Sequence, residues 1–352
     1  MRQAQYFEPL EHQKLRCQLC PRACVIKPGQ VGFCQNRENR GGQLYLNSYG
    51  LSSGFQLDPI EKKPLNHFYP GSAVLSLGTI GCNLSCKFCQ NWGISKEKHW
   101  DHLARPVTPE QLAQAAIEAG ARSVALTYND PVIYAEFAID LAAACRAAGV
   151  EVVLVTAGYV NEEPREALFK DVSAANVDLK AFDDHFYHRL CGGRLSPVKE
   201  TLVYLAQETK VWLEVTTLLI EGENDDPAEL EAMAQWMVEA LGPQVPWHIS
   251  AFHPDHQMLG HPRTGLESLD RARQIGLEAG LHYVYTGNVY HPEGDATHCP
   301  RCSGLVIQRD RYQILSYQLG PGGYCRHCGA QVHGHFADQP GGASPVPRRV
   351  DI

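Results

Sequence analysis

The cysteines are the residues of this sequence whose spacing most directly indicates chemistry. The chain has 352 residues and 13 cysteines, of which eleven fall into three groups. Cys82, Cys86 and Cys89 form a tight triplet. Three thiolates leave one position of a metal centre open, whereas a structural zinc site closes with four protein ligands. Soft thiolates suit iron–sulfur clusters, in which an unligated iron can bind a substrate or cofactor. The triplet therefore predicts a catalytic iron–sulfur site, and a zinc site completed by a distant residue such as Cys191 is the alternative.

Two C-x-x-C pairs lie near the end of the chain: Cys299, Cys302, Cys325 and Cys328. This spacing is typical of a zinc ribbon with closed tetrahedral coordination, although a rubredoxin-like iron centre uses the same ligands. Such a module can serve nucleic-acid binding, but a structural or protein-docking role is the more common use of the same fold. We therefore predict a structural zinc site here.

The third group lies near the N-terminus and contains Cys17, Cys20, Cys24 and Cys34. Its spacing matches neither the bacterial nor the plant ferredoxin pattern. Four thiolates so close in sequence are able to close a second zinc site or to hold an auxiliary iron–sulfur cluster. Both interpretations stay open at this point. The two isolated cysteines, Cys145 and Cys191, are interpreted as small buried apolar side chains.

The elements that must position the triplet are visible as apolar runs. One run, 73–79, directly precedes it, and six more follow at 123–128, 151–156, 176–180, 211–220, 246–252 and 282–287. Near-continuous apolar runs alternating with stretches of helical length are typical of a parallel sheet covered by helices. We predict an α/β fold, a partial or full parallel βα (TIM-like) barrel, with the triplet at the carboxyl end of its first strand, where such folds collect their chemistry.

The same patterns predict the domain boundaries. Residues 1–72 form a cysteine-rich segment, 73–290 the barrel, 291–336 the zinc ribbon, and 337–352 a flexible tail of low apolar content. Thr108, Pro109 and Gln111 predict a capping box at the start of one barrel helix, which Gly120 ends.

Composition restricts the setting. There are 31 basic and 39 acidic residues, for a formal net charge of -8, which argues against a general nucleic-acid binder. The sequence has no long apolar run and no secretory pattern at its start, so we expect a cytoplasmic protein without membrane contact. Thiols are kept reduced in that compartment, which favours metal ligation over disulfides.

The triplet and its neighbours also resemble a known family. GCNLSCKFCQNW is similar to the radical SAM superfamily, in the branch of the pyruvate formate-lyase activating enzyme. Segments 58–72, 125–137, 177–187, 213–225, 252–256 and 285–289 resemble the AmmeMemoRadiSam system radical SAM enzymes. The resemblance implies a [4Fe-4S] cluster on the three cysteines, with S-adenosylmethionine on the open iron. One-electron reduction then yields methionine and a 5′-deoxyadenosyl radical that abstracts hydrogen from a substrate.

The resemblance also implies cofactor-binding residues. They are Asn129, Asp130, Thr156, Lys180 and His253. Asp130 would receive the methionine amino group, where relatives have glutamate, and as an N-cap before Pro131 it has a structural alternative. Lys180 would meet the methionine carboxylate, and His253 the ribose or adenine.

The substrate stays unidentified at this stage. Glu61, Lys62 and Lys63 are candidates for the substrate region. The resemblance implies flavodoxin or ferredoxin as electron donor, and Memo-like and AMMECR-like proteins in the same pathway. A glycyl-radical activase acting on a partner protein needs an open mouth, whereas a small-molecule enzyme needs a closed pocket. A non-catalytic zinc-dependent binding module is the alternative from a different class.

Overall fold

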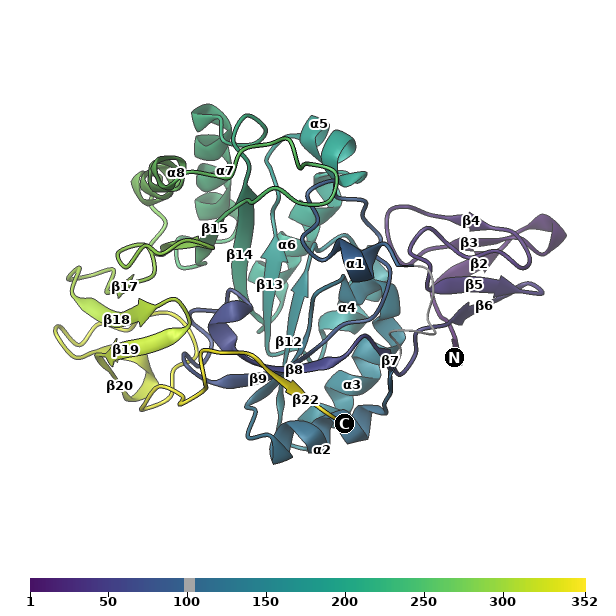
Figure 1. The fold of residues 1–352 in the computed structure, drawn as a ribbon, viewed down its shortest axis with the longest axis horizontal. Helices are drawn as coiled ribbons and strands as arrows, with labels where there is room; N and C mark the ends of the chain where they lie inside the picture. Colours follow the sequence, from purple (N-terminus) through teal and green to yellow (C-terminus); the bar gives the residue numbers. More distant parts are fainter. Residues whose placement is uncertain (98–104) are drawn as a thin grey trace.

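A nine-stranded sheet forms the centre of the molecule in a computed structural model that describes residues 1–97 and 105–352 (Figure 1). Seven of its strands run parallel: β9 (Ala73–Leu77), β11 (Ser123–Leu126), β12 (Glu151–Thr156), β13 (Ala174–Asp178), β14 (Trp212–Leu219), β15 (Trp247–Ala251) and β16 (Val284–Gly287). They coincide with the seven predicted runs. The mostly parallel α/β fold is therefore confirmed.

Two antiparallel strands extend one edge of the sheet, β8 (Phe55–Pro59) and β22 (Arg348–Val350). The full order is β16-β15-β14-β13-β12-β11-β9-β8-β22. Within the described residues the two outermost strands do not pair with each other, so the sheet is open. Of the two predicted forms, the structure has the partial barrel.

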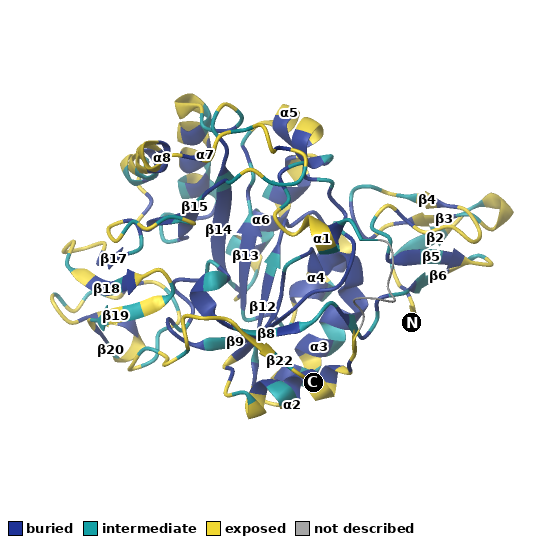
Figure 2. Ribbon diagram, in the orientation of Figure 1, coloured by how far each residue is buried: buried dark blue, intermediate teal, exposed yellow. Residues whose placement is uncertain are grey.

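Helices connect the parallel strands and cover the sheet: α2 (Pro109–Glu118), α3 (Ala135–Ala147), α4 (Glu162–Phe169), α6 (Ser196–Glu208), α7 (Pro227–Ala240) and α8 (Leu266–Glu278). Figure 2 shows their exposed faces turned away from the buried strands. The predicted capping box of α2 is present. Thr108 Oγ1 accepts a hydrogen bond from the Gln111 amide at 3.2 Å, and Gln111 Oε1 accepts one from the Thr108 amide at 2.9 Å.

Shorter helices complete the loops: η1 (Glu11–Gln13), η2 (Ile60–Lys62), α1 (Trp92–Ser95), η3 (Pro131–Tyr134), α5 (Asp184–Phe186), the π-helical turn η4 (Tyr187–Cys191) and η5 (Pro321–Gly323). No helix in the described part of the chain is long and apolar enough to cross a bilayer.

The segment after β8 packs on one face of the sheet. Its apolar side chains Ile60, Leu65 and Phe68 form a cluster with the early residues of four parallel strands, Val74, Ala125, Val153 and Ala174. The fully buried Glu214 carboxylate anchors this segment, because it accepts hydrogen bonds from the backbone amides of Asn66 (3.0 Å) and His67 (2.8 Å). The segment therefore closes one end of the barrel interior.

His67 in this segment predicts an acid-sensitive fold. Burial lowers the pKa of His67 to about 4, so the folded protein holds this ring neutral. The neutral ring can donate a hydrogen bond from Nδ1 to the His333 carbonyl (2.6 Å). Its Nε2 can then accept a hydrogen bond from the Tyr285 hydroxyl (2.5 Å). As the pH falls, His67 is protonated in the unfolded chain, at a pKa of about 6.5, before it is protonated in the folded protein. The free energy of unfolding therefore decreases below about pH 6.5, by about 2 kcal/mol at pH 5. Urea unfolding at pH 7 and pH 5 measures this loss. His67→Gln removes this contribution, and an equal pH dependence in the variant would contradict the assignment.

The N-terminal segment forms two small sheets beside the barrel (Figure 1). One contains β1 (Arg2–Gln3), β6 (Gln43–Leu46) and β5 (Arg37–Arg40), and the other β2 (Phe7–Pro9), β3 (Leu15–Cys17) and β4 (Val25–Ile26). β7 (Leu51–Ser52) pairs with β10 (Arg105–Pro106). A buried ion pair joins this segment to α3, with Arg37 Nη2 at 2.6 and 2.7 Å from the two carboxylate oxygens of Glu136.

The C-terminal module contains β17 (Thr297–His298), β18 (Leu305–Asp310), β19 (Gln313–Tyr317), β20 (Leu319–Gly320) and β21 (Tyr324–Cys325). Its core includes Tyr283 and Tyr285 of the barrel. The buried Arg309 reaches from β18 to the barrel, where Nη2 donates to the Asn66 carbonyl at 2.8 Å. The module is therefore docked firmly on the closed end of the barrel.

The structure differs from two predicted boundaries. Residues 55–59 form β8 and belong to the main sheet, not to a separate segment ending at 72. The expected flexible tail contains β22, which pairs with β8 from Arg348 to Val350. An unpaired edge strand exposes backbone groups that another strand can satisfy, and Val350 packs on the core. Low apolar content hid this pairing, because it depends mainly on backbone hydrogen bonds.

Candidate functional site

The triplet loop begins directly after β9, at the carboxyl end of the parallel strands. Asn129, which follows the neighbouring strand β11, holds this loop in place. Its Oδ1 accepts from the Thr79 amide at 3.0 Å, and its Nδ2 donates to the Gly81 carbonyl at 2.9 Å. The Asn129 amide therefore braces the backbone just before Cys82, and its predicted contact with the cofactor stays a prediction.

The three sulfur atoms of the triplet do not converge on a point. Cys86 is buried and Cys82 and Cys89 are half-buried. Among the described residues, the only group of three or more histidine, cysteine or acidic ligand atoms lying within 4.8 Å of one another is the C-terminal cysteine group. A single zinc ion needs its sulfur ligands about 3.8 Å apart, given Zn–S bonds of about 2.3 Å. A spacing wider than this fits a cluster, whose thiolates bind different iron atoms.

Cys191, which the sequence analysis named as a residue able to complete a zinc site, lies beside the triplet. Its thiol hydrogen-bonds the Cys86 sulfur, which lowers the pKa of Cys86 to about 7. The backbone also joins the two segments, since the Ser85 amide donates to the Cys191 carbonyl at 2.8 Å. The contact was expected only under the zinc alternative, because a π-helical turn more than 100 residues later supplies Cys191.

Asp130 lies close enough to Cys82 to raise the pKa of that thiol, after the effect of burial. Its carboxylate caps η3, where Oδ1 accepts from the Val132 amide at 3.1 Å. It also accepts from Thr156 Oγ1 at 2.9 Å and, through Oδ2, from the Ala157 amide at 2.9 Å. The structural alternative predicted for Asp130 is present, and Thr156 acts as its partner.

Lys180 follows β13 and faces the triplet. Its Nζ lies 2.7 Å from Asp178 Oδ2 and 5.9 Å from the centre of the Phe88 ring. Asp178 of β13 pairs in register with Thr216 of β14. The buried hydroxyl of Thr216 has no hydrogen-bond partner among the described residues. An orphaned hydroxyl beside an ion pair indicates a polar ligand at this place. Thr216 was not among the residues predicted from the sequence.

His253 follows β15 and is less engaged. Its Nδ1 lies 3.4 Å from the Pro254 carbonyl oxygen. The role predicted for His253 therefore stays a prediction.

Comparison with known proteins agrees with this geometry. The sequence profile of the radical SAM superfamily matches residues 77–236, which include the whole triplet loop. The chain is 41% identical to an uncharacterized protein of Methanocaldococcus jannaschii over 333 residues, covering 94% of this chain and 99% of that one. It is also 27% identical over 158 residues to the pyruvate formate-lyase 1-activating enzyme of Escherichia coli, covering 42% of this chain and 62% of the enzyme.

The chain belongs to the radical SAM superfamily. Among solved structures it is similar to a radical SAM methyltransferase from Sphaerobacter thermophilus, with a TM-score of 0.48, 19% identity, and coverage of 62% of this chain and 67% of that one. The superfamily implies a [4Fe-4S] cluster and S-adenosylmethionine as cofactors. The residues present fit both, because three separated thiols lie beside an orphaned hydroxyl and a charged lysine at one edge of the sheet.

A cavity of about 630 Å³ in this radical SAM fold lies between the segment after β8, the ends of β15 and β16, and the C-terminal module. Glu61 and Lys62, which were predicted for the substrate region, line it. Lys63 is instead buried against Asp58, with Nζ 2.6 Å from Oδ2. Four basic residues face two acidic ones in the cavity wall: Lys62, Arg263, Arg309 and Arg311 against Glu61 and Asp295. Burial raises the pKa of both acidic groups to about 7, so the cavity favours an anion.

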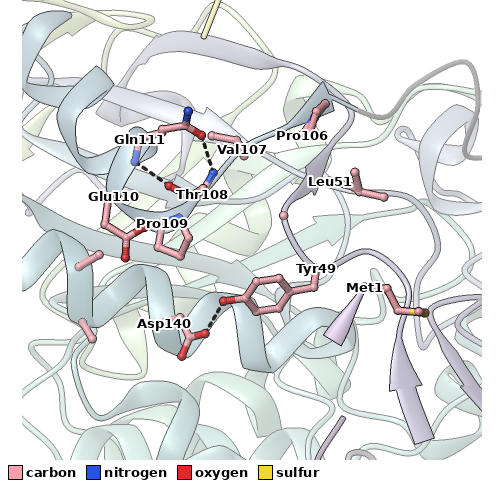
Figure 3. Close-up of a pocket in the computed structure, with 13 residues that line it drawn as sticks. Met1, Tyr49, Leu51, Pro106, Val107, Thr108, Pro109, Glu110, Gln111 and Asp140 are labelled. Carbon is pink, nitrogen blue, oxygen red and sulfur yellow. Dashed lines mark hydrogen bonds between the residues drawn. The ribbon is translucent and has the colours of Figure 1, made fainter. Parts of the chain in front are cut away.

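A larger hollow of about 920 Å³ lies elsewhere, between α2, α3 and the N-terminal segment (Figure 3). Its wall contains the capping box of α2 and the hydrogen bond from the Tyr49 hydroxyl to Asp140. None of the predicted site residues lines it. We assign it no chemistry.

The C-terminal cysteines form the closed site that the sequence predicted. The Cys299 and Cys328 sulfurs are 3.6 Å apart, and those of Cys302 and Cys325 are 3.9 Å apart. Sulfur atoms at these distances fit a tetrahedral zinc ion.

Removing this metal is expected to unfold the module while the barrel persists. Structural zinc contributes about 10 kcal/mol or more to small domains, so Cys299→Ala should lose one zinc per chain and expose 291–336 to protease. Metal analysis with limited proteolysis measures both effects. A variant that keeps its zinc and its protease resistance would contradict the site.

Proposed function

We propose that this chain is a radical SAM enzyme that cleaves S-adenosylmethionine reductively and abstracts hydrogen from a substrate. One observation carries the proposal: three thiols lie together on the loop that follows β9, at the carboxyl end of the parallel strands and beside Lys180. When bound, the cluster supplies the electron that converts S-adenosylmethionine into methionine and a 5′-deoxyadenosyl radical.

The residues around the triplet divide the binding of S-adenosylmethionine between them. Lys180 binds the methionine carboxylate, because its half-buried ammonium has one carboxylate partner, Asp178, among the described residues. Asp130 binds the amino group. A carboxylate can accept about four hydrogen bonds, and Asp130 receives three, two of them on Oδ1, so Oδ2 can accept one more. Phe88 is buried and shields the loop from water.

The cavity lined by Lys62 and Arg309 supports a small anionic substrate. A cavity of this size fits a small-molecule substrate, whereas an activase must admit a segment of a partner protein. The glycyl-radical activase is therefore the second candidate function, favoured by the similarity to the activating enzyme of Escherichia coli. Flavodoxin or ferredoxin is the proposed electron donor, and Memo-like and AMMECR-like partners remain predictions.

Anaerobic reconstitution with iron and sulfide tests the proposal. With dithionite and S-adenosylmethionine, the protein is expected to form 5′-deoxyadenosine and methionine, measured by chromatography. A colourless protein that binds only zinc and forms no 5′-deoxyadenosine would instead support the zinc-dependent binding module.

A further inference from the structure

The N-terminal cysteines share one cavity. Cys17, Cys20, Cys24 and Cys34 all line it, together with the side chains of Arg22 and Arg37. Local hydrogen bonds fold the segment around this space, since the Cys17 amide donates to the Cys24 carbonyl at 2.9 Å and the Ala23 amide to the Cys20 carbonyl at 3.1 Å. Four thiols from β3 and two loops thus face a single small volume.

The spacing of these thiols differs from that of the C-terminal site. No three of the four sulfur atoms lie within 4.8 Å of one another in the described structure, whereas all four of the C-terminal group do. A zinc ion holds sulfur ligands about 3.8 Å apart, whereas the thiolates of a cluster bind separate iron atoms and stand further apart. The same chain therefore shows single-ion spacing at one end and wider spacing around a cavity at the other.

One buried group of the cavity lining lacks a hydrogen-bond partner in the described part of the chain. Arg37 is 1% exposed, and its Nε has no hydrogen-bond partner among the described residues, although its Nη atoms bind Gln5 and Glu136. A buried N–H without a partner is costly, and a thiolate or cluster sulfur would satisfy it. Arg22 adds a second positive charge.

The cavity also adjoins the triplet loop. The Cys34 carbonyl packs so closely on Gly81 that a Cβ there would lie 2.0 Å from the carbonyl oxygen. Arg22 donates to the carbonyls of Asn83 and of Gly192, the latter at 2.6 Å. Gly81 and Asn83 flank Cys82 in the sequence, and Gly192 directly follows Cys191. The two cysteine groups are therefore held in adjacent, rigidly joined loops.

We propose that Cys17, Cys20, Cys24 and Cys34 hold a second iron–sulfur cluster, which passes single electrons to the triplet site. Four thiolates leave no open iron, so this cluster can carry an electron but cannot bind S-adenosylmethionine. Reduced flavodoxin or ferredoxin gives it one electron, and it returns to its oxidised form when that electron moves to the triplet site. No bond forms or breaks in this step. The relay, but not the cluster, rests on the proposed function.

Metal analysis of a variant that lacks the triplet tests the cluster without disturbing its ligands. The variant C82A/C86A/C89A, reconstituted anaerobically, is expected to keep its brown colour, with about four irons if the cluster is of the [4Fe-4S] type, and one zinc. The reduced variant should give an electron paramagnetic resonance signal. A colourless variant with two zinc ions and no iron would overturn the proposal. This result does not depend on whether S-adenosylmethionine is cleaved.

Two reductants test the relay. In the variant C20A/C34A, dithionite is expected to drive 5′-deoxyadenosine formation as in the unaltered protein, because it is small enough to reduce the triplet site directly. Formation driven by reduced flavodoxin is expected to fall to background. Equal loss with both reductants, or no loss with either, would overturn the relay. Cys145→Ala, which removes a buried cysteine of α3, serves as the matched control and should respond like the unaltered protein.

Discussion

Replacing Cys86 by alanine is expected to abolish 5′-deoxyadenosine formation and to remove the iron of the triplet site. Cys86 is the buried member of the triplet, and three ligands are the fewest that hold a cluster while leaving an iron open. Loss of a residue that only hydrogen-bonds a metal ligand costs about 10- to 100-fold in activity. Loss of a ligand itself should therefore cost at least about 100-fold. Product analysis and iron determination on the same sample measure the effect.

The neighbouring thiol requires a second variant. Because Cys191 hydrogen-bonds Cys86, it is the cysteine best placed to replace a missing ligand. Residual activity in Cys86→Ala that disappears in C86A/C191A would identify this replacement. Cys145→Ala controls for the loss of a buried sulfur and should cost only about 1 kcal/mol of stability, with full activity. Full activity in Cys86→Ala and in C86A/C191A would contradict the assignment of the triplet.

Glu136→Ala is expected to destabilise the protein by about 3 to 5 kcal/mol. Removing one partner of a buried ion pair leaves the other charge buried and unpaired. Arg37 and Glu136 have side chains only 1% and 3% exposed, and Glu136 also accepts from the Gln5 amide at 2.7 Å. The substitution therefore strands Arg37 between the N-terminal segment and α3. Urea unfolding followed by circular dichroism measures the loss.

An exposed ion pair of the same segment provides the matched control. Glu8 and Arg16 lie 2.5 Å apart, but their side chains are 37% and 46% exposed. Because water screens such pairs, Glu8→Ala should cost less than about 1 kcal/mol. Equal losses in Glu136→Ala and Glu8→Ala would show that the buried pair does not join the N-terminal segment to the barrel.

Local patterns in the sequence were enough to predict the parallel strands and the C-terminal cysteine group. The run from Glu151 to Thr156 is apolar because both faces of β12 are covered, so its pattern marks the strand directly. The C-terminal group of four cysteines was also predictable, because each C-x-x-C pair fixes two thiols within one turn. Both signals arise from neighbours in the chain.

Features that depend on contacts distant in sequence were not predictable. Cys191 reaches Cys86 only through the fold, and Glu214 binds the Asn66 and His67 amides about 150 residues away. The pairing of β22 with β8 joins backbones almost 300 residues apart and has no side-chain pattern. The metal of the N-terminal group was ambiguous for the same reason, since the distances between its thiols are set by packing on the barrel and not by their spacing in the chain.

The most direct test of the central claim is the electron paramagnetic resonance spectrum of the reduced protein with and without S-adenosylmethionine. If the triplet holds a cluster with an open iron, S-adenosylmethionine should change one component of the spectrum, and that component should be absent from C82A/C86A/C89A. The component of the N-terminal cluster should stay unchanged. A spectrum that does not respond to S-adenosylmethionine, in a protein that contains its full iron, would contradict the assignment of the triplet as the catalytic site.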